Sequence, residues 1–197
     1  MSWGWKPQSR SRVTWSTFEG LALLQVGPRL DFQLDQLPSL MSRMVPNLNV
    51  SVTSPVTDIG EAIDTRRGQY HSTRIMAILE NQNSLAKFEK ILGVTPMDLF
   101  NPSPRADGGG FVFGEARLRG RSGIVSTFRL SADLPSSLLF DNRVKKEVFH
   151  ELGHMVGLDH CSSLGCVMYK SERVEDTDAK SDHYCDSCQS ILRELRH

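Results

Sequence analysis

The first regular feature of the chain is the apolar run Leu21–Val26, which a Gly-Pro pair closes. A short, largely apolar run bounded by turn residues is typical of a strand that is buried on both faces. Residues 48–56 alternate valine with serine and threonine, which predicts a second strand. Between the two, residues 31–44 carry apolar side chains at helical spacing, so we expect a helix there that Pro38 interrupts.

Farther along the chain, helical and strand-like patterns alternate. Apolar residues at helical spacing in Gln69–Glu80 predict an amphipathic helix, and Ser84–Ile91 predicts a further short helical turn. Leu92–Thr95 predicts a strand that the following proline limits. Strands that alternate with helices indicate an α/β layer built on a largely parallel sheet.

Two strand-like segments, Phe111–Ala116 and Ile124–Leu130, precede the last long helical pattern. The charged, glycine-bounded turn 117–123 joins them, so we expect the two strands to pair as a hairpin. Apolar residues at helical spacing then predict a helix over about residues 142–156.

The end of this predicted helix carries the motif H-E-x-x-H-x-x-G-x-x-H, from His150 to His160. Residues four apart share one face of a helix, so His150 and His154 can present their imidazoles to one ion. Gly157 is free to adopt a positive φ, which would end the helix and return His160 as a third ligand. Three histidines with one open position are the coordination of a catalytic zinc site, and the elongated motif is the metzincin signature.

Glu151 follows the first histidine and lies about 100° round the helix from it. From there its carboxylate can reach a zinc-activated water without binding the metal, so we expect it to be the general base. Asp141 or Asn142 is the expected N-cap of the helix. The alternative is a solvated helix face that merely contains two histidines and a glutamate, and the correctly spaced third histidine disfavours it.

All four cysteines lie within the last 37 residues of the chain, and they form two short pairs. The pairs are Cys161 with Cys166 and Cys185 with Cys188. Such paired half-sites are typical of a tetrahedral Cys₄ zinc centre, whereas buried thiols and two disulfides are the alternatives. We expect a structural zinc that ties the polar segment 161–188 to the active-site helix.

The bulk properties exclude some classes of protein. Lys plus Arg and Asp plus Glu both number 23 in 197 residues, so net charge gives no electrostatic case for binding nucleic acid or an anionic membrane. The first apolar run is too short for a signal peptide core or a membrane span. We therefore expect a cytoplasmic monomer without a nucleic-acid or membrane partner, in which one domain covers residues 18–197 and residues 1–17 form an extension or a first strand.

The C-terminal motifs together resemble the archaemetzincin family. The resemblance rests on the run His150–His160, the adjoining Cys161, the segment Cys166-x-Met168, and Cys185-x2-Cys188. Weaker marks of the family are Phe111–Ala116 and Arg129-Leu130 at the close of the following strand. Met168 matches the Met-turn that lies beneath the zinc in metzincins, although a lone methionine is usually an ordinary core residue.

This resemblance implies an α/β (α+β) fold of the compact metzincin type. It implies a mixed twisted sheet with one antiparallel edge strand above the cleft, packed on the active-site helix, and two zinc ions per chain, one catalytic and one in a C-terminal Cys₄ subsite. It also implies a zinc metallopeptidase that acts on peptides or proteins, and some members are aminopeptidases. The alternative is a zinc-stabilised protein that binds peptides without turnover; the intact Glu151 favours the enzyme.

Overall fold

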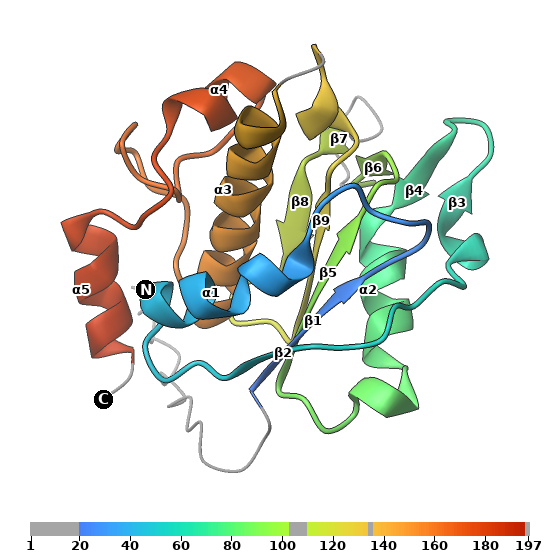
Figure 1. The fold of residues 1–197 in the computed structure, drawn as a ribbon, viewed down its shortest axis with the longest axis horizontal. Coiled ribbons are helices and arrows are strands. Elements are labelled where there is room, and N and C mark those ends of the chain that lie inside the picture. The colour runs from blue at the N-terminus through green and yellow to red at the C-terminus, as the bar shows by residue number, and fades with distance from the viewer. Residues whose placement is uncertain (1–19, 103–109, 134–135, 196–197) are drawn as a thin grey trace, which may run out of the picture.

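The computed structural model of the chain describes residues 20–102, 110–133 and 136–195. The prediction for residues 1–17 lies outside the described residues. The centre of the molecule is a five-stranded sheet in the order β2-β1-β5-β9-β8, in which β8 alone runs antiparallel to its neighbour (Figure 1). The strands are β1 Leu21–Gln25, β2 Val50–Val52, β5 Lys90–Thr95, β8 Gly114–Ala116 and β9 Ser122–Ser126.

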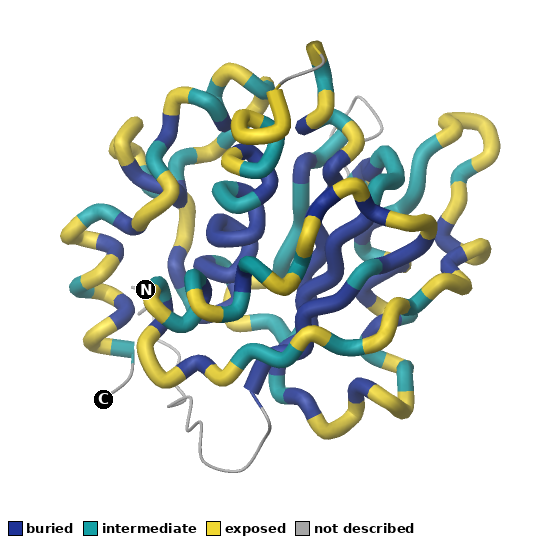
Figure 2. Tube along the Cα trace, in the orientation of Figure 1, coloured by how far each residue is buried: buried dark blue, intermediate teal, exposed yellow. Residues whose placement is uncertain are grey.

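Helices cover both faces of this sheet. Helix α3, Ser137–Val156, packs on one face together with α1, Pro38–Met44, and α5, Asp186–Glu194. Helix α2, Ser72–Glu80, packs on the other face. Alternate residues of β1 enter different hydrophobic clusters, because successive side chains of a strand point to opposite faces: Leu23 joins the α3 side and Leu24 the α2 side. The central strands and the inner face of α3 are accordingly buried (Figure 2).

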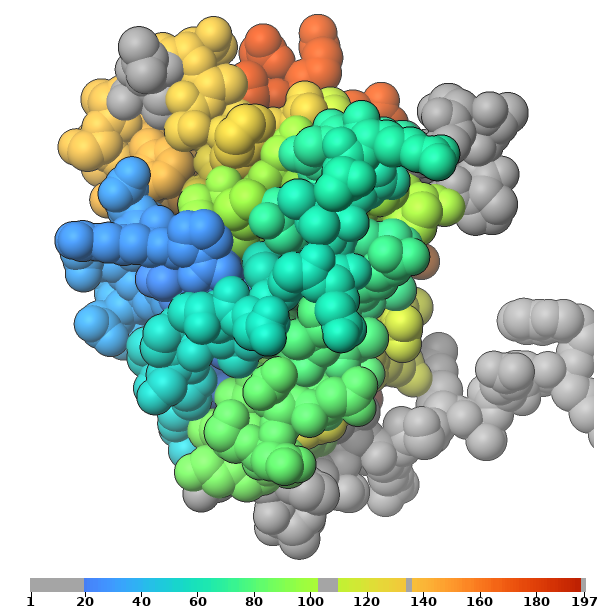
Figure 3. Space-filling model, turned by 90° about the vertical axis from the view of Figure 1, so that its right-hand side faces the viewer, coloured from blue at the N-terminus to red at the C-terminus, as the bar shows by residue number. Residues whose placement is uncertain are grey.

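A second, smaller sheet in the order β3-β4-β6-β7 adjoins the α2 side. Its strands are β3 Ile63–Asp64, β4 Gln69–His71, β6 Leu99–Phe100 and β7 Phe111–Val112. Seen from the side of α2, the chain from β2 to β6 forms most of the visible surface (Figure 3). The mixed sheet with one antiparallel edge strand is therefore confirmed, and the second sheet is an addition to it.

The predicted strand Phe111–Ala116 is wrong as a single element. The chain bends at Phe113, whose side chain is buried and whose carbonyl accepts a hydrogen bond from the Ser126 amide at 2.7 Å. The bend places β7 in the small sheet and β8 in the large one. Strand β8 still pairs with β9 as the predicted hairpin.

Strand β9 begins and ends earlier than the predicted Ile124–Leu130. The Phe128 amide donates to the Ser126 hydroxyl oxygen at 3.2 Å, and this local turn ends the strand. Arg129–Ser131 then forms the 3₁₀ helix η4 instead of closing the strand.

Two N-terminal predictions change in length or type. The helix expected over residues 31–44 consists of the 3₁₀ helix η1, Leu34–Gln36, and α1, Pro38–Met44; Pro38 opens α1 because its missing N–H is not needed in a first turn. The strand expected over residues 48–56 is confined to β2 and one isolated bridge at Val56.

Two predictions in the middle of the chain also change. Gln69–His71 is strand β4 because it pairs with β3 and β6, so α2 starts at Ser72. The short helical turn expected over 84–91 is the 3₁₀ helix η3, Asn83–Leu85, and β5 begins at Lys90. The remaining 3₁₀ helix is η2, Gly60–Ala62.

The long helix α3 begins earlier than predicted and ends where predicted. Its N-cap is Ser136 and not the predicted Asp141 or Asn142. The Ser136 hydroxyl accepts a hydrogen bond from the Leu139 amide at 3.3 Å. Gly157 at φ +107° ends it in the left-handed region. Two short helices follow, α4 Val174–Ala179 and α5 Asp186–Glu194. In the described residues no helix is long and apolar enough to cross a membrane.

Candidate metal centres

The three motif histidines come together at the C-terminal end of α3. Their potential ligand atoms all lie within 4.8 Å of one another. The left-handed Gly157 makes this convergence possible: the Leu158 amide donates to the Gly153 carbonyl at 2.8 Å, and the chain then turns back toward α3. His160 thereby returns to His150, with 5.3 Å between the ring centroids.

Hydrogen bonds orient two of the rings for metal binding. His150 Nδ1 lies 2.8 Å from the Val167 carbonyl oxygen, and His154 Nδ1 lies 2.9 Å from that of Leu158. A carbonyl oxygen only accepts, so each Nδ1 donates its hydrogen and each Nε2 of the neutral ring keeps a free lone pair. Burial first, and then the Lys180 ammonium, lower the pKa of His150 to about 3, so this ring is neutral.

The two free lone pairs point at each other across 3.1 Å, from Nε2 of His150 to Nε2 of His154. Two lone pairs at that distance repel unless a cation or a proton lies between them. Zn–N bonds of ~2.0–2.1 Å in a tetrahedron place two nitrogens about 3.3 Å apart. The histidine group therefore fits zinc in both donor chemistry and spacing.

A carboxyl group completes this site. Glu151 is 4% exposed, and within the described part of the chain its Oε2 has no hydrogen-bond partner. Strand β8 passes close over it, since a Cβ at Gly114 would lie 2.5 Å from Glu151 Oε1. Burial, and then the Glu147 carboxylate, raise the pKa of Glu151 well above its ordinary value. A buried carboxyl oxygen without a partner is costly, and such groups mark functional sites.

The histidines and Glu151 line a cleft of about 530 Å³. The lining of the cleft comes from β7, β8, α3 and residues 170–172.

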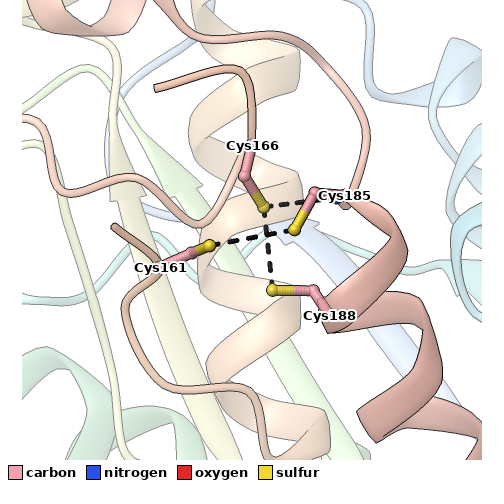
Figure 4. A group of neighbouring side chains, drawn as sticks. All are labelled: Cys161, Cys166, Cys185 and Cys188. Carbon is pink, nitrogen blue, oxygen red and sulfur yellow. Dashed lines mark hydrogen bonds between the residues drawn. The ribbon is translucent and has the colours of Figure 1, made fainter. Parts of the chain in front are cut away.

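The four cysteines form a second group, about the start of α5 (Figure 4). Cys161 Sγ lies 3.8 Å from Cys185 Sγ, and Cys166 Sγ lies 3.7 Å from Cys188 Sγ. Disulfide sulfurs are about 2.05 Å apart, so neither pair is a disulfide. A tetrahedron of Zn–S bonds of ~2.3 Å places its sulfurs about 3.8 Å apart, so this group fits zinc as well.

Met168 connects the two groups. Its side chain is fully buried against α3, where a Cβ on Gly153 would meet its Sδ at 2.2 Å. Its carbonyl accepts from the Cys161 amide at 2.9 Å, and the neighbouring Val167 carbonyl holds His150. The methionine therefore lies between the cysteine group and the helix that carries the first two histidines.

We expect Gly153→Ala to lower the melting temperature and to speed zinc loss from the histidine group. The added methyl overpacks Met168 at a cost of about 1–3 kcal/mol, which outweighs the ~1 kcal/mol that alanine gains over glycine in a helix. Gly165→Ala is the matched control, because nothing lies within 4 Å of its Cβ position. Thermal unfolding and chelator release of zinc measure both effects; equal behaviour of the two variants would contradict this packing.

Comparison with known proteins places the chain in a family. The profile described as "Peptidase family M54" matches residues 43–194. The archaemetzincin of Halobacterium salinarum is 37% identical over 157 residues, which cover 76% of this chain and 86% of the relative. That of Archaeoglobus fulgidus is 39% identical over 140 residues, or 71% and 79% of the two chains. The chain belongs to peptidase family M54, the archaemetzincins.

Solved archaemetzincins share the fold. The crystal structure of the Methanopyrus kandleri archaemetzincin superposes with a TM-score of 0.79 at 31% identity and covers 93% of this chain and 98% of that one. The structure of a zinc-dependent peptidase from Methanocorpusculum labreanum gives a TM-score of 0.70 at 29% identity, with coverage of 88% and 100%. The predicted metzincin-type fold and the zinc metallopeptidase class are confirmed, and substrates of this archaemetzincin are peptides or proteins.

The archaemetzincin site also contains residues that the sequence did not reveal. Glu147 lies one helical turn before His150 and Glu151, so its spacing of three and four residues was a usable signal. Gly114 and Lys180 gave no such signal, because their partners are distant along the chain.

Proposed function

We propose that His150, His154 and His160 hold the catalytic zinc of this metallopeptidase and that Glu151 is its general base. One observation carries the proposal: two neutral imidazoles direct free Nε2 atoms at each other across 3.1 Å, and the buried Glu151 lines the same cleft. Zinc held there would polarise the scissile carbonyl and lower the pKa of a water molecule. Glu151 takes a proton from the attacking water and passes it to the leaving amine.

We propose that the substrate extends along β8. Among the described strands β8 pairs with β9 alone, so its other edge is free to hydrogen-bond a peptide main chain beside Glu151. Glu115 of β8 lines the cleft and is held by the Ser72 and Thr73 hydroxyls, and no Lys or Arg of the described residues pairs with it. A carboxylate without a cationic partner on the strand that would carry the peptide favours a free amino terminus, which supports aminopeptidase action.

We propose that Cys161, Cys166, Cys185 and Cys188 hold a second, structural zinc and that Met168 is the Met-turn. The four-sulfur donor set leaves no ligand position free for a substrate, which supports a structural role. One catalytic domain over residues 18–197 is also part of the proposal, since both hydrophobic clusters share the strands of the large sheet. The monomeric state and the cytoplasmic location stay predictions.

The test combines zinc counting with peptide cleavage. We expect native mass spectrometry to show two zinc ions per chain, and a mild chelator to remove one of them first, because the histidine group leaves a position open to competing ligands. Removal of that ion should abolish cleavage of a peptide library with free amino termini, and N-acetylation of the library should slow cleavage. A single zinc in the native protein would contradict the proposal of two zinc sites. Full activity after removal of the more labile zinc would contradict the histidine site.

A further inference from the structure

A buried ion pair lies directly behind the histidine group. Lys180, which follows α4, places its Nζ 2.9 Å from Glu147 Oε1, and the two side chains are 0% and 4% exposed. Burying two charges costs free energy that their attraction repays only with good geometry and further hydrogen bonds. Lysine and glutamate are rarely buried to this extent, so the pair calls for a local reason.

The Lys180 ammonium contacts both the helix and the turn that follows the cysteines. It lies 3.5 Å from His150 Nδ1 and 3.4 Å from the Tyr169 carbonyl oxygen. Two residues before Tyr169, the Val167 carbonyl accepts the hydrogen bond that orients His150. The first and the last carbonyl of the tripeptide Val167–Tyr169 are thus connected to α3. His150 holds the first directly, and Lys180, itself held by Glu147 of α3, holds the last.

The segment that carries α4 and Lys180 is attached to α3 by other side chains as well, so Lys180 is not needed for that attachment. Arg143 forms a bidentate pair with Asp178, at 2.7 Å for both contacts. Lys146 donates to the Thr177 and Asp178 carbonyls at 3.0 and 2.9 Å. Both tethers reach the α4 segment from neighbouring turns of α3, and neither contacts His150 or Tyr169.

We propose that Lys180 is a positioning residue of the histidine site, with Glu147 as its counter-ion. The ammonium fixes the Tyr169 carbonyl, and with it the Val167 carbonyl, so that the His150 ring presents Nε2 to the metal. Partners behind a metal-binding histidine orient the ring, and their loss typically weakens metal binding ~10–100-fold. This inference rests on the proposed function, in which His150 is a zinc ligand.

The experiment measures zinc affinity in competition with a chromophoric chelator. Glu147→Gln/Lys180→Met removes both charges at similar volume, so no buried charge is left unpaired and the fold should persist. We expect its more labile zinc to bind at least ~10-fold more weakly than in the wild type. Lys146→Met, the matched control, loosens the same segment and should leave zinc affinity within about twofold.

A second measurement follows the His150 ring itself. Imidazole nitrogen NMR of the zinc-loaded protein should show the His150 Nδ1 proton exchanging faster in the double variant and unchanged in Lys146→Met. If the double variant does not fold, Lys180→Met alone is measured, because the Glu147 carboxyl keeps the hydrogen bond from the Thr177 hydroxyl at 2.9 Å and can be neutralised by a proton. The expected direction of both changes is the same. Wild-type affinity and proton exchange in the folded charge-free variant, or equal losses in Lys146→Met, would overturn the role of Lys180. A wild-type protein without a labile zinc would instead overturn the proposed function.

Discussion

Glu151→Ala is expected to lower peptide turnover by at least ~10²-fold, the lower end of what a positioned general base contributes. Both zinc ions and the fold should remain, because the Glu151 carboxylate binds neither metal in the proposed site. The melting temperature should hold or rise, since a buried carboxyl with an unpartnered oxygen is removed. Steady-state kinetics on zinc-loaded protein, with zinc counted by native mass spectrometry, measures these effects.

Two comparisons separate the loss of a base from other effects. Glu172→Ala removes a carboxylate from the exposed wall of the same cleft and should leave turnover within a few-fold. His154→Ala should release the labile zinc instead, because it removes one of three proposed ligands. Cleavage that survives intact in Glu151→Ala would show that another group is the base. Peptide binding without cleavage by wild type would favour the binding-protein alternative.

Cys185→Ser is expected to remove the second zinc and to lower the melting temperature by about 10 °C or more. Loss of a structural metal is among the few changes that cost more than ~4 kcal/mol, and each kcal/mol shifts the melting temperature of a chain of this size by ~2–4 °C. The segment between the cysteine pairs is largely polar and most of its side chains are partly or fully exposed, so its own apolar burial is small and the metal adds the missing stability. Activity should fall as well, because Met168 hydrogen-bonds Cys161.

Ser187→Ala is the matched control for the cysteine site. Ser187 lies between the two distal cysteines with an exposed side chain, so its replacement should change neither the zinc count nor the melting temperature. Calorimetry and native mass spectrometry of the two variants measure the difference. The structural role of the cysteine site is wrong if Cys185→Ser keeps its second zinc and has the melting temperature of the wild type.

Local spacing along the sequence was enough to predict the family and the two groups of candidate metal ligands that the structure brings together. His150 and His154 share a helix face, Gly157 ends that helix, and the cysteine pairs are each a few residues apart. The strand β1, buried on both faces, and the hairpin β8–β9 were also predictable, because burial on both faces and a short turn leave clear patterns. These features depend on residues that are close together in the chain.

Only the tertiary structure decided the features whose partners are distant. The chain bends at Phe113 because β7 and β8 pair with different sheets, and Gln69–His71 is a strand because β3 and β6 flank it. Strands of two or three residues are too short to show a period. Lys180 had no visible role in the sequence, since Glu147 lies 33 positions earlier and folding alone brings the two charges together.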